Sequence, residues 1–136
     1  MEKKINFLEI RKESYKTSRN VFTSFKYAFS GISYVLKTSR NFKIQLIFAV
    51  ASLVIGFLLK ISLSNYVILI ATIISVLILE ILNTSIESIV DLVVKREFSS
   101  LAKISKDTSS GAVLLASVNS VIIAVYVFFP KIKLLF

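Results

Sequence analysis

Three long apolar segments constrain this chain more than any other feature of its sequence. They carry no charged side chain and cover residues 44–59, 66–79 and 111–129. A helix of about 20 residues crosses the hydrocarbon of a bilayer, and flanking Lys and Tyr side chains can extend a shorter one. The composition agrees, because 55% of the residues are hydrophobic and the mean hydropathy is +0.78, far above that of a soluble domain. We predict an all-α integral membrane protein whose spans cover about 44–60, 66–94 and 110–129.

The residue types that this sequence lacks narrow its chemistry. The sequence contains no Cys and no His. A disulfide framework and a thiolate metal site are therefore excluded, and the most common general base is missing. The glycine loops of P-loop enzymes and protein kinases are also missing, which excludes the standard soluble nucleotide-binding folds. Any catalysis must use carboxylates, Lys, Ser or Tyr, with or without a metal ion.

The basic residues predict the orientation of the spans. Ten Lys and Arg precede the first span and four stand in the second connection, against one in the first connection and two in the tail. Fourteen thus fall on one side of the membrane and three on the other. Because cytoplasmic loops carry the excess of Lys and Arg, we expect a cytoplasmic N-terminus. The first apolar segment begins too late for a cleaved signal peptide.

The region before the first span shows an amphipathic pattern. Between about residues 20 and 37, one helical face collects the apolar side chains Val21, Phe22, Phe25, Phe29 and Ile32. We predict a surface helix that lies on the cytoplasmic leaflet. A soluble helix that packs on a partner is the alternative. Residues 1–19 are polar and form an N-terminal extension, which we expect to be poorly ordered or a short helix.

Four polar side chains interrupt the second apolar segment as it continues toward residue 94. They are Glu80, Asn83, Glu87 and Asp91. At about 100° per residue they form one stripe, about 16 Å long, which we call the acidic stripe. Because the next loop is predicted to be cytoplasmic, the stripe occupies the inner half of the membrane, with Glu80 deepest. A helix end that enters water can carry charge, which suits Asp91, but carboxylates inside a membrane usually mark a functional site.

The acidic stripe favours phosphoryl transfer to a lipid hydroxyl. Two carboxylates one or two turns apart can hold Mg²⁺ together with substrate phosphates, and a deeper carboxylate can accept the proton of the hydroxyl. The second connection adds four cations, and we expect residues 107–109 to begin the third helix, whose free N–H groups would suit a phosphate. The alternative is that Asp107 or Thr108 only caps this helix and that the cations only set the orientation.

The motifs around the stripe resemble the prokaryotic diacylglycerol kinase family, which includes the undecaprenol kinases of Gram-positive bacteria. The resemblance rests on "EILNTSIESIVDLV" at 80–93, "AKISKDTSSGAVLLAS" at 102–117 and "SFKYAFSGISYVLKTSRNFKIQL" at 24–46. It covers roughly residues 20–130. It implies that residues 20–136 form a multi-pass lipid kinase domain of the bacterial inner membrane, which uses ATP and Mg²⁺ and assembles as a homotrimer. An oligomer also agrees with the stripe, because we expect one subunit to be unable to shield three carboxylates from lipid.

The resemblance also implies roles for single residues of this sequence. Glu80 matches the general base, and Glu87 matches a metal-binding carboxylate. Asn83 and Asp91 match polar positions that support the site. The matching ATP-binding positions are Tyr27, Glu87, Glu97, Lys106 and Asp107.

One departure from the family pattern concerns the metal. A second metal-binding Glu is expected just before "RNF", and this sequence has Ser39 there. The hypothesis is that the enzyme needs more Mg²⁺ than a member with both carboxylates. The motifs "RNFKIQL" at 40–46 and "ILNTSIE" at 81–87 resemble the undecaprenol kinases more than the diacylglycerol kinases, which favours undecaprenol as the substrate. A diacylglycerol kinase, a small carboxylate-based transporter and a catalytically weak membrane scaffold are the alternatives.

Overall fold

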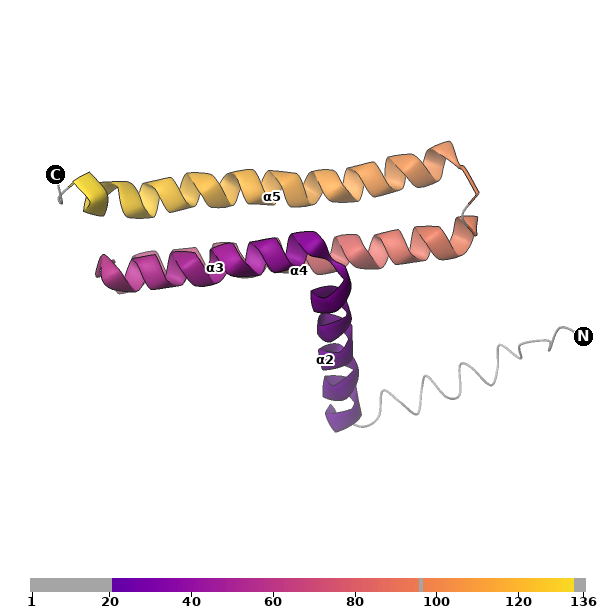
Figure 1. Cartoon of the computed structure of the whole chain (residues 1–136), viewed down its shortest axis with the longest axis horizontal. Coiled ribbons are helices and arrows are strands. Elements are labelled where there is room, and N and C mark those ends of the chain that lie inside the picture. The colour runs from indigo at the N-terminus through magenta and orange to yellow at the C-terminus, as the bar shows by residue number, and fades with distance from the viewer. Residues whose placement is uncertain (1–20, 96, 134–136) are drawn as a thin grey trace, which may run out of the picture. The chain divides into compact units, whose positions relative to one another are not determined.

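The computed structural model describes residues 21–95 and 97–133, and this part of the chain is helical apart from short turns. Its helices are α2 (Val21–Thr38), α3 (Arg40–Leu58), α4 (Leu63–Val94) and α5 (Ser100–Lys133) (Figure 1). The chain forms two compact units, divided between Lys37 and Thr38. The prediction of an all-α fold is confirmed. The predicted N-terminal extension lies outside the described residues.

The first unit contains the predicted surface helix. The bounds of α2 agree with the expected range of about 20–37. Its aromatic face is open, since Phe22, Phe25 and Phe29 are 86%, 60% and 69% exposed. Such a face is suited to the interface between headgroups and acyl chains.

The second unit is a bundle in which α4 packs against both α3 and α5, and both run antiparallel to it (Figure 1). The turn between α3 and α4 is tight because Lys60 adopts a left-handed conformation with φ of 49°. The N–H of the next residue, Ile61, then donates to the carbonyl of Gly56 at 3.2 Å, which satisfies an orphan group at the end of the helix. Lys95 ends α4 with the same φ.

A small apolar core lies beside the α3–α4 turn, at the end of the bundle away from the acidic stripe. Ile61, Leu69 and Val127 are buried there. Gly56 permits this packing, because a Cβ added to it would lie 2.9 Å from Cδ1 of Ile61. Tyr66 adds a hydrogen bond from its hydroxyl to the carbonyl of Leu53 at 3.3 Å.

Three helices of the described chain are long and apolar enough to cross a membrane, namely α3, α4 and α5. Most of their large apolar side chains are exposed in the isolated chain, which suits contact with lipid rather than water. Their hydroxyl groups are satisfied within the helices, since Thr72, Ser75 and Ser85 each donate to the carbonyl four residues earlier. This is required where no water can supply a partner. The predicted three spans are therefore present.

The third predicted span, which is α5, differs from its predicted bounds. It begins at Ser100 instead of near residue 107, because Ser99 accepts hydrogen bonds from the next turn through its hydroxyl and its carbonyl. Asp107 consequently lies two turns inside α5, so the prediction that residues 107–109 offer free N–H groups to a phosphate is wrong. The helix also continues through Pro130 to Lys133. Pro130 removes only one hydrogen bond, close to the end of the helix.

Candidate active site

Glu80 is held by two side chains, those of Ser39, which caps the N-terminus of α3, and Gln45 of α3. The hydroxyl of Ser39 donates to its Oε1 at 2.7 Å, and Nε2 of Gln45 donates to its Oε2 at 3.3 Å. Glu80 is only 2% exposed. A buried carboxylate needs such partners, because an unpaired one would be very costly. Both oxygens of Glu80 thus have a fixed orientation within a single chain.

This arrangement corrects one step of the argument for an oligomer. We expected that one subunit could not shield the acidic stripe, but Glu80 and Asn83 are buried in a single chain. The expectation fails for Glu80 alone, because Ser39 and Gln45 supply it with hydrogen-bond donors that the apolar pattern of the segment does not reveal. Glu87 is only partly buried and Asp91 is exposed.

Asn83 joins the middle of the stripe to α5. Its Nδ2 donates to Oε1 of Glu87 at 3.1 Å, and its Oδ1 accepts from the hydroxyls of Ser109 at 2.6 Å and Ser110 at 3.3 Å. One oxygen of Glu87 is therefore oriented by Asn83. In the described part of the chain the other oxygen has no hydrogen-bond partner from the protein, so it remains available to a ligand.

The outer end of the stripe is paired with a cation. Nζ of Lys106 lies 2.7 Å from Oδ1 of Asp91, which links α5 to α4. Lys103 and Asp107 form a second ion pair one turn apart along α5, and both side chains are about two-thirds exposed. Lys106 thus faces the stripe, while Asp107 is bound to a neighbour on its own helix.

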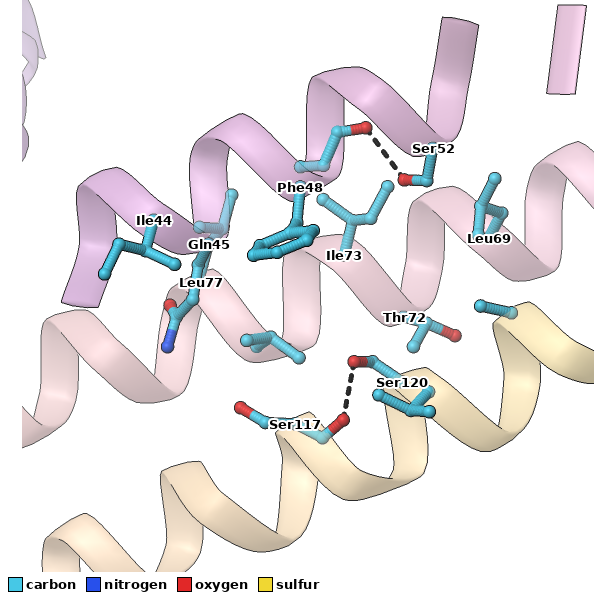
Figure 2. Close-up of a pocket in the computed structure, with 14 residues that line it drawn as sticks. Ile44, Gln45, Phe48, Ser52, Leu69, Thr72, Ile73, Leu77, Ser117 and Ser120 are labelled. Carbon is cyan, nitrogen blue, oxygen red and sulfur yellow. Dashed lines mark hydrogen bonds between the residues drawn. The ribbon is translucent and has the colours of Figure 1, made fainter. Parts of the chain in front are cut away.

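Two adjoining cavities meet beside Glu80. The larger, about 390 Å³, is mostly apolar and lies between α3, α4 and α5 (Figure 2). The smaller, about 280 Å³, contains Glu80, Asn83 and Glu87 in its wall. Ile44, Gln45 and Ser117 line both cavities. An apolar cavity therefore adjoins a polar one that has two carboxylates in its wall.

The predicted site residues are only partly brought together. Glu80, Asn83 and Glu87 share one cavity, and Asp91 and Lys106 are paired next to it along the same helices. Glu97 is exposed in the turn after α4, where its N–H donates to the carbonyl of Val94. Asp107 is exposed and Tyr27 belongs to the first unit. The ATP-binding roles of these three residues stay predictions.

Two residues at the site were missed or misassigned from the sequence. Ser39 was expected to face a metal beside Glu87, but its hydroxyl donates to Glu80. Gln45 received no role. The only signal for Gln45 was an amide inside the otherwise apolar segment "IQLIF". An uncharged polar residue of this kind does not reveal which helix it faces.

A family model described as prokaryotic diacylglycerol kinase matches residues 26–128. This chain belongs to the prokaryotic diacylglycerol kinase family. It is 40% identical over 123 residues to a protein of Synechocystis sp. named diacylglycerol kinase, across 90% of this chain and 70% of that relative. It is also 40% identical over 111 residues to a protein of Bacillus subtilis named undecaprenol kinase, across 82% of this chain and 89% of that relative.

Membership of the diacylglycerol kinase family confirms the broad functional prediction. The chain is a membrane protein and a lipid kinase, which transfers a phosphoryl group to a lipid within the bilayer. The transporter therefore loses its support as an alternative. The two relatives carry different substrate names, so the lipid itself has to be argued from the site.

Proposed function

We propose that this kinase phosphorylates undecaprenol with MgATP at the cytoplasmic face of the membrane. The observation that carries the proposal is the pair of adjoining cavities. The end of a long hydrocarbon chain fits the apolar cavity, which lies between three spans, and its terminal hydroxyl would then reach the polar cavity at Glu80. Sites that bind lipids and cofactors combine an apolar wall with a few placed polar groups in this way.

The hydroxyl groups of the apolar cavity favour a polyprenol over a diacylglycerol. Diacylglycerol carries two ester carbonyls near its hydroxyl, and buried carbonyls need hydrogen-bond donors. Four hydroxyl side chains line this cavity, and each already donates to a carbonyl of its own helix: Ser52, Thr72, Ser117 and Ser120. Their hydroxyl protons are already used in these bonds, so they cannot donate to an ester carbonyl of the lipid. A polyprenol has no ester, so it loses nothing there.

The depth of the stripe supports the proposed direction of attack. Counted from Leu63, the first residue of α4, Glu80 lies about 26 Å along the helix and Glu87 about 36 Å, at 1.5 Å per residue. The hydrocarbon is about 30 Å thick. If it begins near Leu63, Glu80 sits just inside its inner boundary and Glu87 lies among the headgroups. The lipid would thus approach Glu80 from the bilayer and the nucleotide would approach Glu87 from the cytosol.

In the proposed reaction Glu80 is the general base. The hydroxyl oxygen of the lipid attacks the γ-phosphorus of ATP, and its proton passes to the Glu80 carboxylate. The bond from the γ-phosphorus to the bridging oxygen breaks, and its electron pair leaves with ADP. General-base catalysis of this kind contributes about 10²- to 10⁴-fold. Ser39 and Gln45 would hold the carboxylate in position during the transfer.

The residues at the polar cavity fit a magnesium ion that arrives with the nucleotide. The described residues contain no group of three or more Asp or Glu that could hold a metal alone. Mg²⁺ is commonly held by one or two carboxylates, with phosphates and water completing its shell. Glu87 has one oxygen available and would supply that carboxylate. The bound ion would neutralise charge on the phosphates of ATP.

We also propose that the active unit is a homotrimer with its N-terminus in the cytoplasm. The excess of basic residues before residue 44 and within residues 95–106 supports this orientation. Glu87 is only partly buried and Asp91 is exposed in one chain. Carboxylates at this depth usually face water or a partner, and a neighbouring subunit would provide one.

A competition between lipids tests the proposed substrate. Purified enzyme in vesicles would receive undecaprenol and dioleoylglycerol at equal mole fractions, with labelled ATP, and the two phosphorylated products would be separated. We expect undecaprenyl phosphate to be the main product. Glu80→Gln is the control, because it should lose both products. A predominance of phosphatidic acid would overturn the choice of substrate while leaving the kinase assignment intact.

A further inference from the structure

Gln45 contains an unusual polar atom. In the described part of the chain, its Oε1 is the one buried side-chain oxygen or nitrogen without a hydrogen-bond partner. Leaving such an acceptor unpaired is unfavourable. The amide cannot relieve this by turning over, because its Nε2 donates to Oε2 of Glu80. A half-turn would place Oε1 against the carboxylate, with one acceptor facing another.

The place of Gln45 in the fold indicates where a donor would come from. Gln45 lies in the wall that the apolar and polar cavities share. Figure 2 shows it at one end of the apolar cavity, next to Ile44 and Leu77. The hydroxyl side chains of the apolar cavity are already paired with backbone carbonyls. Gln45 is therefore the lining residue of this cavity that holds an unpaired acceptor, and a small shift of its buried amide would bring Oε1 to a donor that enters there.

We propose that Gln45 is a positioning residue that receives the hydroxyl of the lipid alcohol. The inference rests on the proposed function, in which the alcohol enters through the apolar cavity. The O–H of the alcohol donates to Oε1 of Gln45 when the lipid binds. Nε2 of the same amide donates to Glu80. One amide group therefore holds the docked hydroxyl at its oxygen and the carboxylate of the base at its nitrogen. Rotation about the C–O bond of the alcohol then turns its proton from Gln45 toward Glu80.

This role explains why an amide suits the position. A hydrocarbon side chain would offer no acceptor to the hydroxyl. A carboxylate would set a second negative charge against Glu80. Gln supplies a donor for the base and an acceptor for the substrate at the same time. The docking step therefore selects for a free hydroxyl before any phosphoryl transfer occurs.

Binding without ATP tests the docking step, because no turnover interferes. The purified protein in vesicles would be labelled with a short-chain prenol that carries a photoreactive diazirine. Undecaprenol and its methyl ether would then compete with the label. The ether keeps the chain and the oxygen but has lost the O–H donor. We expect the ether to need about a 5- to 10-fold higher mole fraction than the alcohol, which is the effect of one hydrogen bond.

Three variants distinguish Gln45 from Glu80 as the docking acceptor. In Gln45→Met the ether and the alcohol should compete nearly equally, because the acceptor is gone. Glu80→Gln should keep the preference for the alcohol. Thr72→Val is the matched control in the same cavity, since the hydroxyl of Thr72 is already bound to the carbonyl of Ile68, and it should also keep the preference. Unchanged thermal unfolding of each purified variant would show that it is folded.

The possible outcomes separate this inference from the proposed function. A preference that survives in Gln45→Met but disappears in Glu80→Gln would overturn the inference, because the hydroxyl would then dock on the base. An equal preference in all four proteins would also overturn it. If dioleoylglycerol competes and undecaprenol does not, the proposed substrate is wrong. The same comparison with dioleoylglycerol and its methyl ether would then still decide the role of Gln45.

Discussion

Ser39 offers the sharpest test of how the site is built, because one side chain performs two tasks. Its hydroxyl donates to Oε1 of Glu80 at 2.7 Å, and its oxygen accepts from the N–H of Phe42 at 3.1 Å, which caps α3. A hydrogen bond to a charged group contributes about 1.5–3 kcal/mol. Loss of a Ser cap costs about 1 kcal/mol when Ala replaces it and only a few tenths when Gly does.

A series of substitutions separates the two tasks of Ser39. Ser39→Ala and Ser39→Gly both lose the bond to Glu80, so kcat for lipid phosphorylation should fall by about 10- to 100-fold in each. Both variants should also be less stable to heat, because buried Glu80 loses a hydrogen-bond partner, and Ser39→Ala should be the less stable of the two, because Gly is tolerated as a cap. Ser39→Thr keeps the hydroxyl and is the control, with near-normal kcat and stability.

The assay is the initial rate of lipid phosphorylation at saturating ATP and lipid, in vesicles, together with thermal unfolding of each purified variant. A KM for ATP that stays unchanged would show that the nucleotide site is intact. Wild-type kcat in both Ser39→Ala and Ser39→Gly would refute the view that Ser39 positions the base. A rate that falls only in the less stable variant would refute it as well.

Three further predictions concern the metal, the nucleotide and the assembly. Glu87→Ala should abolish activity, because it removes the carboxylate that would hold Mg²⁺. Ser39→Glu should slow the reaction without lowering the Mg²⁺ concentration for half-maximal rate, because a second carboxylate would replace the donor to Glu80; a lower midpoint would instead show that this position faces the ion. Lys106→Gln should raise the KM for ATP about 10-fold, whereas Lys103→Gln, which removes only the exposed pair with Asp107, should leave it unchanged; equal effects would contradict the assignment of Lys106. Cross-linking in mild detergent should trap a trimer, and monomer alone would count against the proposed assembly.

The fold was largely predictable because its signals are local. A run of apolar residues long enough to cross a bilayer predicts a helix wherever it occurs, and helical spacing alone places Glu80, Asn83 and Glu87 on one stripe. The start of α5 was not predictable in the same way. Ser99 and Asp107 are both suitable caps, and the choice between them depends on how far α5 extends along α4 beyond the membrane.

The partners of the base were beyond sequence reasoning for a different reason. Ser39 and Gln45 lie 41 and 35 residues from Glu80, and their contacts depend on the register between α3 and α4. No local pattern encodes that register, since most of α3 is apolar on all sides. The family resemblance pointed to Ser39 as an altered metal position, whereas the contact with Glu80 became visible only in the packed helices.

The most direct measurement compares phosphoryl transfer and nucleotide binding in Glu80→Gln. The substitution keeps the shape of the side chain and removes its ability to accept a proton. Labelled phosphate transferred from ATP to undecaprenol would be counted with purified protein in vesicles, and the Kd of MgATP would be measured on the same preparation. We expect a rate at least about 10²-fold below that of the wild type, with an unchanged Kd. Wild-type transfer by Glu80→Gln would contradict this expectation.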